Sequence, residues 1–295
     1  MIQLKNVVKQ VDESFTLGPV SFKIAPGMVT ALIGPNGSGK SVFLRTLMGL
    51  SHPSEGMITR FGETDHLAHQ WKNRVGYVPQ TSSGYEAFTL AELAQLYQIG
   101  YDNWDEEAFQ AFVARYELPL KKRLRDMSVG NQRQALSVLA LSRNTELLVL
   151  DEPLAGVDML AQGLLLEDWI TYLEENPERA ILFATHIPEE VKELADYIYC
   201  LRQGKEVGFY EKDQLLDSYA RFWVQTAPEN VRNLPGVMSV IERGPQVEVM
   251  TSAVDETEVG LTRQQLKVLM KEKLTFAEIL RDLLKRGVMQ SDVKN

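Results

Sequence analysis

The sequence predicts an α/β fold whose central sheet has a parallel core, followed by a small α+β region at the C-terminal end. Short apolar segments typical of strands alternate with segments that have the periodicity of amphipathic helices. Two of the strand-like segments, LLVLDEP at 147–153 and AILFATH at 180–186, begin with unbroken apolar runs, as strands buried on both faces do. A glycine-rich segment at 34–41 also joins a strand-like segment to a helix-like one.

The first part of the chain is expected to form short strands around one helix. Pro26-Gly27 marks a turn between two of the strands, and the helix covers VFLRTLMGL at 42–50. The expected strands cover residues 1–8, 19–24, 28–34, 56–62 and 74–80.

The middle of the chain is expected to be helical first and then to alternate between strand and helix. Helices are expected at 90–99, at 106–116 and from Ser128 to about 141. The strand at 147–153 precedes a helix at 160–176, the strand at 180–186 precedes a helix at 188–197, and paired strands are expected across 198–210.

The character of the sequence changes after about Leu216, and this change predicts two domains. The first covers 1–216 and includes a helical subdomain at about 85–140. The second, 217–295, is a small α+β accessory domain. It is expected to contain a hairpin at 236–251 and helices at 264–273 and 275–287.

The net charge, the cysteine count and the apolar segments of the chain limit which partners and which cellular setting are expected. The 295-residue chain has a formal net charge of −9, which argues against nucleic acid as a partner. Cys200 is its single cysteine, so no internal disulfide is possible and a reducing cytosol is the expected setting. The N-terminal MIQLKNVVKQ lacks the apolar region of a secretion signal. No apolar run approaches about eighteen residues, so the chain is not expected to span a membrane itself, and docking on a protein that does stays open.

GPNGSGKS at 34–41 matches the phosphate-loop pattern G-x-x-x-x-G-K-[ST] between a strand and a helix. Its glycines allow backbone N–H groups to surround phosphates, Lys40 adds a positive charge, and the Ser41 hydroxyl is suited to holding Mg²⁺. The alternative is a plain glycine turn. The residues expected to bind the nucleotide are Gly34, Pro35, Asn36, Gly37, Ser38, Gly39, Lys40, Ser41 and Val42.

Asp151 and Glu152 end the first continuously apolar strand, and ligands of parallel sheets bind at that end of the strands. Asp151 is expected to hold the metal, and Glu152 to activate or orient the attacking water. A solvated turn before Pro153 is the alternative. Gln80 and His186 end two further strands. Each is unremarkable alone, and His186 is well placed to reach a γ-phosphate.

The ordered set GPNGSGKS, YVPQ, MSVGNQ, LLVLDEP, LAGVD and TH resembles the ATP-binding cassette (ABC) ATPases over about residues 1–215. The resemblance implies an ABC-type P-loop NTPase that binds ATP and Mg²⁺. Ser41, Gln80 and Asp151 would contact the metal, and Glu152, His186 and Gln80 would be catalytic. The resemblance also implies that 128–131 is the signature motif, in which Ser128 and Gly130 would bind the γ-phosphate of a partner's ATP. Residues 154–158 would be the D-loop of the family.

The chain departs from this pattern at two places. Val129 and Asn131 replace the glycine and glutamine of the common LSGGQ signature. A backbone N–H still serves a phosphate there, and similar relaxed signatures are known from cassettes that pair with separate ABC-2-type export permeases. The position of the adenine-stacking aromatic falls near Val11, which is not aromatic, and Phe15 is the substitute four residues later.

The resemblance implies a subunit on the inner face of the cell membrane that drives a permease, with export favoured. A second copy arranged head-to-tail, or a paralogous cassette, completes the ATP sites. The alternatives are a soluble cassette ATPase in assembly or repair and a non-catalytic regulator, which the presence of Glu152 and His186 disfavours. KKRLR at 121–125 is either a solvated face or a contact with the permease or membrane.

Overall fold

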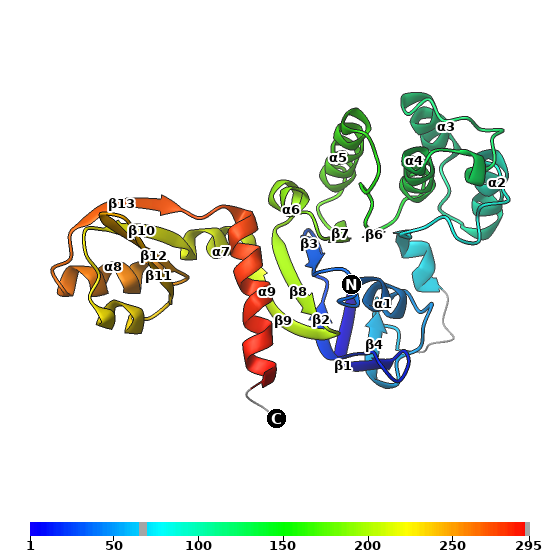
Figure 1. The fold of residues 1–295 in the computed structure, drawn as a ribbon. Helices are drawn as coiled ribbons and strands as arrows, with labels where there is room; N and C mark the ends of the chain where they lie inside the picture. Colours follow the sequence, from blue (N-terminus) through cyan, green and yellow to red (C-terminus); the bar gives the residue numbers. More distant parts are fainter. Residues whose placement is uncertain (65–69, 293–295) are drawn as a thin grey trace. The chain divides into compact units, whose positions relative to one another are not determined.

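The computed structural model describes residues 1–64 and 70–292 and divides the chain into two compact units (Figure 1). The first is Met1–Gly208 and the second is Phe209–Asn295. The boundary expected between residues 216 and 217 falls inside α7 (Lys212–Ser218), and the assignment of 1–216 and 217–295 as domains stays a prediction. Among the described helices, none combines the length and the apolar character needed to cross a bilayer.

The core of the first unit is a six-stranded sheet in the order β5-β6-β7-β3-β8-β9. The first five strands of this order are parallel to their neighbours, as the sequence predicts. They are β5 (Val75–Val78), β6 (Leu147–Asp151), β7 (Ala180–Thr185), β3 (Val29–Ile33) and β8 (Tyr197–Arg202), and β9 (Lys205–Glu211) completes the sheet. All residues of β3, β6 and β7 are buried, which explains their continuously apolar sequences.

The register of the parallel strands brings three chain segments to one edge of this sheet. Ile33 at the end of β3 pairs with Thr185 at the end of β7, and Asp151 at the end of β6 pairs with Ala184. The residues that follow these strands therefore leave the sheet side by side. The sheet thus collects the phosphate loop, the carboxylate pair and His186 at its carboxyl edge.

A second, antiparallel sheet covers the other side of helix α1 (Lys40–Leu47) and has the order β2-β1-β4. Its strands are β1 (Ile2–Gln10), β2 (Thr16–Lys23) and β4 (Glu55–Arg60). Phe22 of β2 packs edge-on against Phe43 of α1 and Tyr199 of β8, with ring centroids 5.4 and 4.9 Å apart. This aromatic cluster holds α1 between the two sheets in the main hydrophobic core.

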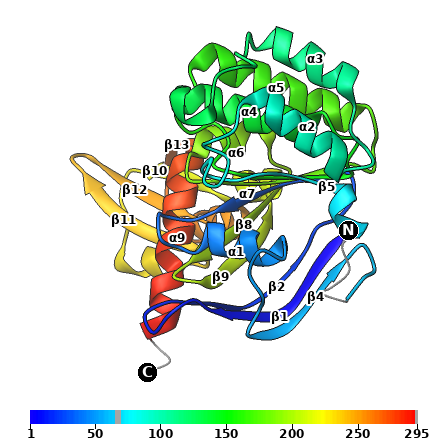
Figure 2. The same cartoon turned by 90° about the vertical axis from the view of Figure 1, so that its right-hand side faces the viewer.

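The helical region follows β5 and contains three helices that pack on one another (Figures 1 and 2). Thr89 and Glu92 form a reciprocal capping box, Asp105 caps the next helix, and Ser128 caps the third. The helices are α2 (Leu90–Gly100), α3 (Glu106–Arg115) and α4 (Val129–Leu141), and two 3₁₀ turns, η1 (Gln70–Arg74) and η2 (Leu124–Asp126), precede β5 and α4. The sequence predicts all three helices to within one or two residues.

Two more helices complete the first unit. Asp158 caps α5 (Met159–Glu174) by accepting a hydrogen bond from the Ala161 N–H, and Pro188 opens α6 (Pro188–Leu194) at the first turn, where its missing N–H costs nothing. Trp169 and Leu165 are fully buried residues of α5. Both helices were expected from the sequence.

The second unit contains a four-stranded antiparallel sheet in the order β11-β12-β10-β13. This order and the connections between the strands match the split βαβ arrangement, with the first helix reduced to a 3₁₀ turn. The elements are β10 (Ala220–Val224), η3 (Glu229–Asn233), β11 (Val237–Arg243), β12 (Gln246–Thr251), α8 (Val254–Arg263), β13 (Val268–Lys273) and α9 (Phe276–Asp292), and α7 precedes them.

The hairpin expected at 236–251 and the helix at 275–287 are confirmed, whereas the helix expected at 264–273 is wrong. Residues 268–273 form β13, which pairs with β10 from Val268↔Val224 to Lys273↔Ala220. The segment is a short apolar run of ambiguous period, and its pairing with β10 decides its structure. The sequence did not indicate β10 or α8.

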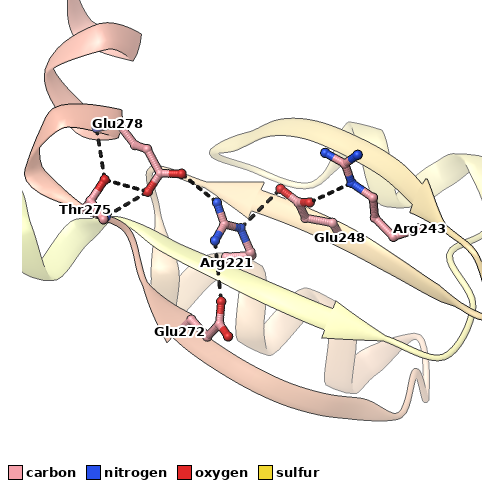
Figure 3. Close-up of polar contacts among 6 residues, drawn as sticks. All are labelled: Arg221, Arg243, Glu248, Glu272, Thr275 and Glu278. Carbon is pink, nitrogen blue, oxygen red and sulfur yellow. Dashed lines mark hydrogen bonds and ion pairs between the residues drawn. The ribbon is translucent and has the colours of Figure 1, made fainter.

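A charged network ties α9 to the sheet of the second unit (Figure 3). The Arg221 guanidinium on β10 contacts Glu248 on β12 at 3.1 Å, Glu272 on β13 at 3.4 Å and Glu278 on α9 at 2.7 Å. Arg243 contacts the same Glu248 at 3.2 Å. Glu278 also accepts a hydrogen bond from the Thr275 N–H at the start of α9, so the helix terminus and the sheet share one carboxylate.

Candidate functional site

The phosphate loop is built by the end of β3 and the start of α1. Gly37 and Gly39 have φ angles of 77° and 103°, a backbone conformation that favours glycine. A Cβ on Gly34 would collide with the Leu201 carbonyl oxygen, so the first position of the loop also requires glycine. The Ser38 N–H donates to the Pro35 carbonyl at 3.0 Å, which closes the loop on itself. The loop therefore has the tight, N–H-rich shape that a phosphate chain needs.

Lys40 and Glu152 meet above this loop. The Lys40 ammonium donates to the Gly34 carbonyl at 2.9 Å and forms an ion pair with Glu152 Oε1 at 3.3 Å. His186 Nδ1 lies 2.9 Å from the other oxygen of the same carboxylate. Glu152 is only 4% exposed and has a φ of 51°, with its N–H bonded to the Ala184 carbonyl at 3.0 Å. Glu152 is thus held in a strained backbone conformation between a cation and an imidazole, as residues of active sites often are.

Asp151 is buried beside Ser41 and has one unused oxygen. Burial raises the pKa of Asp151, and a hydrogen bond with Ser41 opposes that rise. Among the described residues, Oδ1 of Asp151 has no hydrogen-bond partner. The Ser41 hydroxyl lies 3.5 Å from Gln80 Oε1. A carboxylate, a hydroxyl and an amide oxygen are the hard ligands that Mg²⁺ prefers, so these residues fit a magnesium site.

A cavity of about 450 Å³ opens over the loop. Its walls include Gln80, Glu152, Val11, Asp12 and Phe15. The other lining residues are the predicted loop residues Asn36, Gly37, Ser38, Gly39, Lys40, Ser41 and Val42. This volume lies in the usual range of small-molecule sites. The cavity therefore brings most of the predicted loop residues together with Gln80 and Glu152, while Gly34, Pro35, Asp151 and His186 are not among its lining residues. Of these four, His186 contacts Glu152 and Asp151 interacts with Ser41.

Ser128 and Gly130 are not among the residues that line this cavity. Ser128 caps α4: its Oγ accepts the Asn131 N–H at 3.1 Å and donates to Asn131 Oδ1 at 2.9 Å. Asn131 therefore donates one hydrogen bond to the serine hydroxyl through its backbone N–H and accepts another through its side-chain oxygen. The start of α4 is therefore formed and capped within the chain, and it lies outside the cavity over the phosphate loop.

Val129 packs on the D-loop of the same chain. A Cβ built on Gly156 would lie 3.2 Å from Val129 Cγ1, and one built on Gly130 would lie 3.0 Å from the Gly156 carbonyl oxygen. Gly156 has a φ of 75°, so glycine is favoured there on conformational grounds too. The start of α4 and the turn after Glu152 thus form one packed unit.

Arg133 is a residue of this site that the sequence did not indicate. It lies on α4 and is buried, and its Nη1 donates to the carbonyl oxygens of Asp151 at 3.2 Å and Glu152 at 2.8 Å. Burial lowers the pKa of Arg133, and the two carboxylates oppose that change. Arg133 stands between Gln132 and Gln134 in the polar first part of α4, so the sequence carried no signal that this arginine is buried.

Two other expectations concern Phe15 and the basic run at 121–125. The Phe15 ring lies against the loop, because a Cβ on Gly39 would be 2.8 Å from Phe15 Cζ. The ring is partly buried on the main core. In the basic run, Leu124 is buried while the basic side chains are exposed. A contact of this run with a permease or a membrane stays a prediction.

A glycine-rich loop at the carboxyl edge of a parallel sheet, facing a lysine and two buried carboxylates, defines a phosphate-loop nucleotide hydrolase. The family profile described as ABC transporter matches residues 17–155. Nod factor export ATP-binding protein I of Burkholderia orbicola is 30% identical over 224 residues, which cover 74% of this chain and 73% of that protein. The chain therefore belongs to the ATP-binding proteins of the ABC transporter family, and so to the ABC-type ATPases.

Other relatives agree with this assignment. ABC transporter ATP-binding protein YtrB of Bacillus subtilis is 27% identical over 221 residues, which cover 75% of each chain. A solved ATP-binding subunit of an ABC transporter superposes with a TM-score of 0.65 at 26% identity, over 74% of this chain and 92% of that chain. A dimeric ATP-binding cassette with bound ADP and Pi superposes with a TM-score of 0.63 at 21% identity, over 72% of this chain and 98% of that chain. The expected mixed α/β cassette fold is confirmed.

Proposed function

We propose that the chain is the ATP-binding and ATP-hydrolysing subunit of an ABC transporter and that it energises a separate membrane permease. The observation that carries this proposal is that Lys40 and Glu152 line the cavity over the phosphate loop, with His186 bonded to the same carboxylate and Asp151 the residue before it at the end of β6. Membership of the family supports the transport role, and the names of relatives that export Nod factors support export as the direction. Docking would take place on the inner face of the cell membrane.

In the proposed mechanism, the loop N–H groups and Lys40 bind the β- and γ-phosphates. Ser41, Gln80 and Asp151 would hold Mg²⁺, which supplies charge neutralisation on the phosphates when bound. The Lys40 ammonium has three donors, of which Gly34 and Glu152 take two. When the ammonium turns to the phosphates, Glu152 loses its cation and becomes free to orient the attacking water. His186, on the far side of that carboxylate, would contact the γ-phosphate.

The signature would act in trans. In this chain Ser128 and Gly130 do not line the chain's own cavity, so a second cassette has to bring its own α4 N-terminus to the γ-phosphate. A helix N-terminus with free N–H groups suits that contact. The second cassette is another copy of this chain, arranged head-to-tail. ATP binding would close the pair, hydrolysis would open it, and the permease would follow this motion.

The proposal is tested by hydrolysis and by membrane capture. The purified chain should hydrolyse Mg-ATP, and the full-length tagged chain should co-purify with an integral-membrane protein from detergent-solubilised membranes of its host. Hydrolysis without any membrane partner would favour a soluble cassette ATPase instead. Absence of hydrolysis, alone and with the captured partner, would contradict the ATPase role. If the variant with Glu152→Gln stays monomeric in Mg-ATP, the partner cassette is a paralogue rather than a second copy.

A further inference from the structure

The basic run at 121–125 places a dense group of exposed cations on an acidic protein. No other five-residue stretch of the sequence contains four lysines or arginines, and the net charge of the chain is −9. The buried Leu124 anchors the run, and the exposed cations are Lys121, Lys122, Arg123 and Arg125. Among the ion pairs between described residues, this run takes part in that of Arg125 with Asp126, which is 3.9 Å long with both side chains more than half exposed. The run therefore forms a local positive charge.

The basic run lies beside the start of α2. Arg123 forms an isolated antiparallel bridge with Thr89, the residue that caps this helix. The Leu124 N–H donates to the Phe88 carbonyl at 2.9 Å. The Phe88 side chain, next to these bonds, is 38% exposed. Backbone contacts therefore fix the cations at the N-terminal end of α2, next to an exposed aromatic residue.

The outer side of α2 extends this surface with apolar side chains. Glu92, Leu96 and Ile99 are spaced by four and three residues, so they lie on one face of the helix. Leu96 is 50% exposed and Ile99 is 84% exposed. Hydrogen bonds from Thr89 lower the pKa of Glu92, and the nearby Arg123 cation lowers it further. Arg123 thus lies on the same side of α2 as the two apolar residues.

The carboxylates on these segments are held close to the backbone. Glu92 accepts hydrogen bonds from the Thr89 N–H at 2.7 Å and the Thr89 hydroxyl at 2.9 Å. Glu86 accepts one from the Gly84 N–H at 2.7 Å. Lysine and arginine side chains are longer and extend their charge into solvent. The charge that extends furthest from this surface is therefore positive.

Exposed apolar side chains next to cations are the combination that binds an anionic bilayer surface. The apolar side chains enter the region between head groups and acyl chains, and the cations contact the lipid phosphates. Each lysine or arginine near such a surface strengthens binding by about fivefold. The negative charge on more distant parts of the chain is screened beyond about 10 Å. A fluid bilayer also accommodates a protruding side chain such as Ile99 without a groove shaped to receive it.

We propose that the chain binds anionic phospholipid surfaces directly, through a lipid-facing surface made of residues 121–125 together with Phe88, Leu96 and Ile99. The juxtaposition of exposed cations and exposed apolar side chains at one end and one face of α2 carries this inference. It goes beyond the proposed function, because the contact with lipid needs neither ATP nor a permease.

The test measures sedimentation of the full-length chain with protein-free, sucrose-loaded vesicles in the absence of nucleotide. One set of vesicles is pure phosphatidylcholine and the other contains about 30% phosphatidylglycerol. We expect binding to the anionic vesicles to be at least about tenfold tighter, and to weaken as the salt rises from about 0.1 M to about 0.5 M. No binding to the anionic vesicles, or equal binding to both sets, would overturn the inference.

A double substitution locates the electrostatic part of the contact. Lys121→Gln with Lys122→Gln should weaken binding to the anionic vesicles by about 25-fold, because two cations are lost. The matched control is Lys205→Gln with Lys267→Gln, which removes the same charge from two other exposed positions and should bind as the wild type does. Equal losses in the two double variants would mean that overall charge governs binding, and would contradict a lipid-facing surface at 121–125.

A single substitution tests the apolar part of the surface. Ile99→Gln should weaken binding to the anionic vesicles by about 3- to 10-fold and should also reduce the binding that remains at high salt. Leu160→Gln is the matched control, because Leu160 on α5 is also 84% exposed, and it should bind as the wild type does. Both are surface changes, so both melting temperatures should stay within about 1 °C of the wild type. Wild-type binding by Ile99→Gln would overturn the assignment of α2 to this surface.

Failure of this inference is distinguishable from failure of the proposed function. A chain that co-purifies with an integral-membrane protein but binds no protein-free vesicle overturns the lipid contact and leaves the transport role standing. If the Lys121→Gln, Lys122→Gln variant then loses the membrane protein as well, the basic run contacts that protein instead of lipid. A chain that binds anionic vesicles but hydrolyses no ATP, alone or with the captured partner, supports the lipid contact and contradicts the ATPase role.

Discussion

The ammonium of Lys40 and the carboxylate of Glu152 form an ion pair 3.3 Å long in which both side chains are nearly inaccessible to solvent. The lysine comes from the first residue of α1 and the glutamate from the residue after β6, so the pair joins two segments 112 positions apart. A buried pair of this kind is costly to break by removing one partner. In the proposed mechanism a phosphate of the nucleotide replaces Glu152 as the partner of the lysine.

Lys40→Ala should remove nucleotide binding. The variant lacks the cation that faces the phosphates and leaves Glu152 buried with His186 as its remaining side-chain partner. We expect titration calorimetry with the Mg²⁺ complex of the ATP imido analogue to show no saturable binding. Lys205→Ala, on an exposed lysine of β9, is the control and should bind as the wild type does. Unchanged affinity in Lys40→Ala would contradict the assignment of the phosphate loop.

Glu152→Gln should stop turnover while keeping ATP bound. Glutamine preserves the shape of the side chain but cannot accept a proton from water, so we expect at least a ~100-fold loss of kcat, the usual contribution of a general base. Light scattering should then show an ATP-dependent dimer that does not dissociate. Glu242→Gln makes the same chemical change at an exposed position of β11 and should leave both measurements unaltered. Normal hydrolysis by Glu152→Gln would remove Glu152 from the catalytic role.

Ser128→Arg should separate ATP binding from closure of the pair. The substitution puts a long cation where the capped start of α4 has to meet a phosphate, while Ser128 lies outside the chain's own cavity. Each subunit should therefore bind ATP with the wild-type affinity, and the Glu152→Gln background should no longer form an ATP-dependent dimer. Dimer formation in the double variant would show that Ser128 takes no part in the contact between cassettes.

Arg133→Met should lower the stability of the protein. The substitution leaves the carbonyls of Asp151 and Glu152 without their buried donor, at a cost of about 1–3 kcal/mol for each unsatisfied group. Each kcal/mol lost corresponds to a fall of about 2–4 °C in the melting temperature of a domain of this size. Arg125→Met, on an exposed arginine, should melt within about 1 °C of the wild type. A wild-type melting temperature in Arg133→Met would show that the two hydrogen bonds contribute nothing.

Two Gly→Ala substitutions should have different effects: one should weaken nucleotide binding, and the other should raise the stability of the protein. Gly34→Ala brings a Cβ against the Leu201 carbonyl and should distort the phosphate loop, so nucleotide affinity is expected to fall. Gly163→Ala lies within α5, where a Cβ meets no atom within 4 Å, and should stabilise the protein by about 0.5–1 kcal/mol. Binding assays and thermal melts check the two effects. Wild-type nucleotide affinity in Gly34→Ala would mean that the loop accommodates a Cβ at this position.

The parts of the fold that follow from local pattern were predictable from the sequence. The buried strands β6 and β7 are unbroken apolar runs, and the phosphate loop carries its own glycine spacing, so both were expected at the positions where they lie. The order of the motifs then indicated which residues meet at the sheet edge. The motif order predicts that Lys40, Asp151, Glu152 and His186 lie near one another, and in the structure Lys40 and His186 both contact the Glu152 carboxylate.

What escaped prediction depends on tertiary pairing. Residues 268–273 have a sequence compatible with either helix or strand, and their pairing with β10 selects the strand. Arg133 lies one turn beyond the signature, and its role depends on carbonyl groups that any sequence would supply at positions 151 and 152. Every residue has a backbone carbonyl whatever its side chain. A sequence motif therefore cannot indicate which carbonyl groups a buried arginine will bind.

The packing of Val129 on Gly156 couples the residues that positions 129 and 156 can accept. A bulky residue at 129 occupies the space that any side chain at 156 would need, since Val129 Cγ1 lies 3.2 Å from the Cβ that such a residue would add. During evolutionary drift the two positions are therefore expected to covary, with a small residue at 129 releasing the steric part of the constraint on 156. Engineers who restore a common LSGGQ-type signature here would also widen the set of D-loop sequences that the fold accepts.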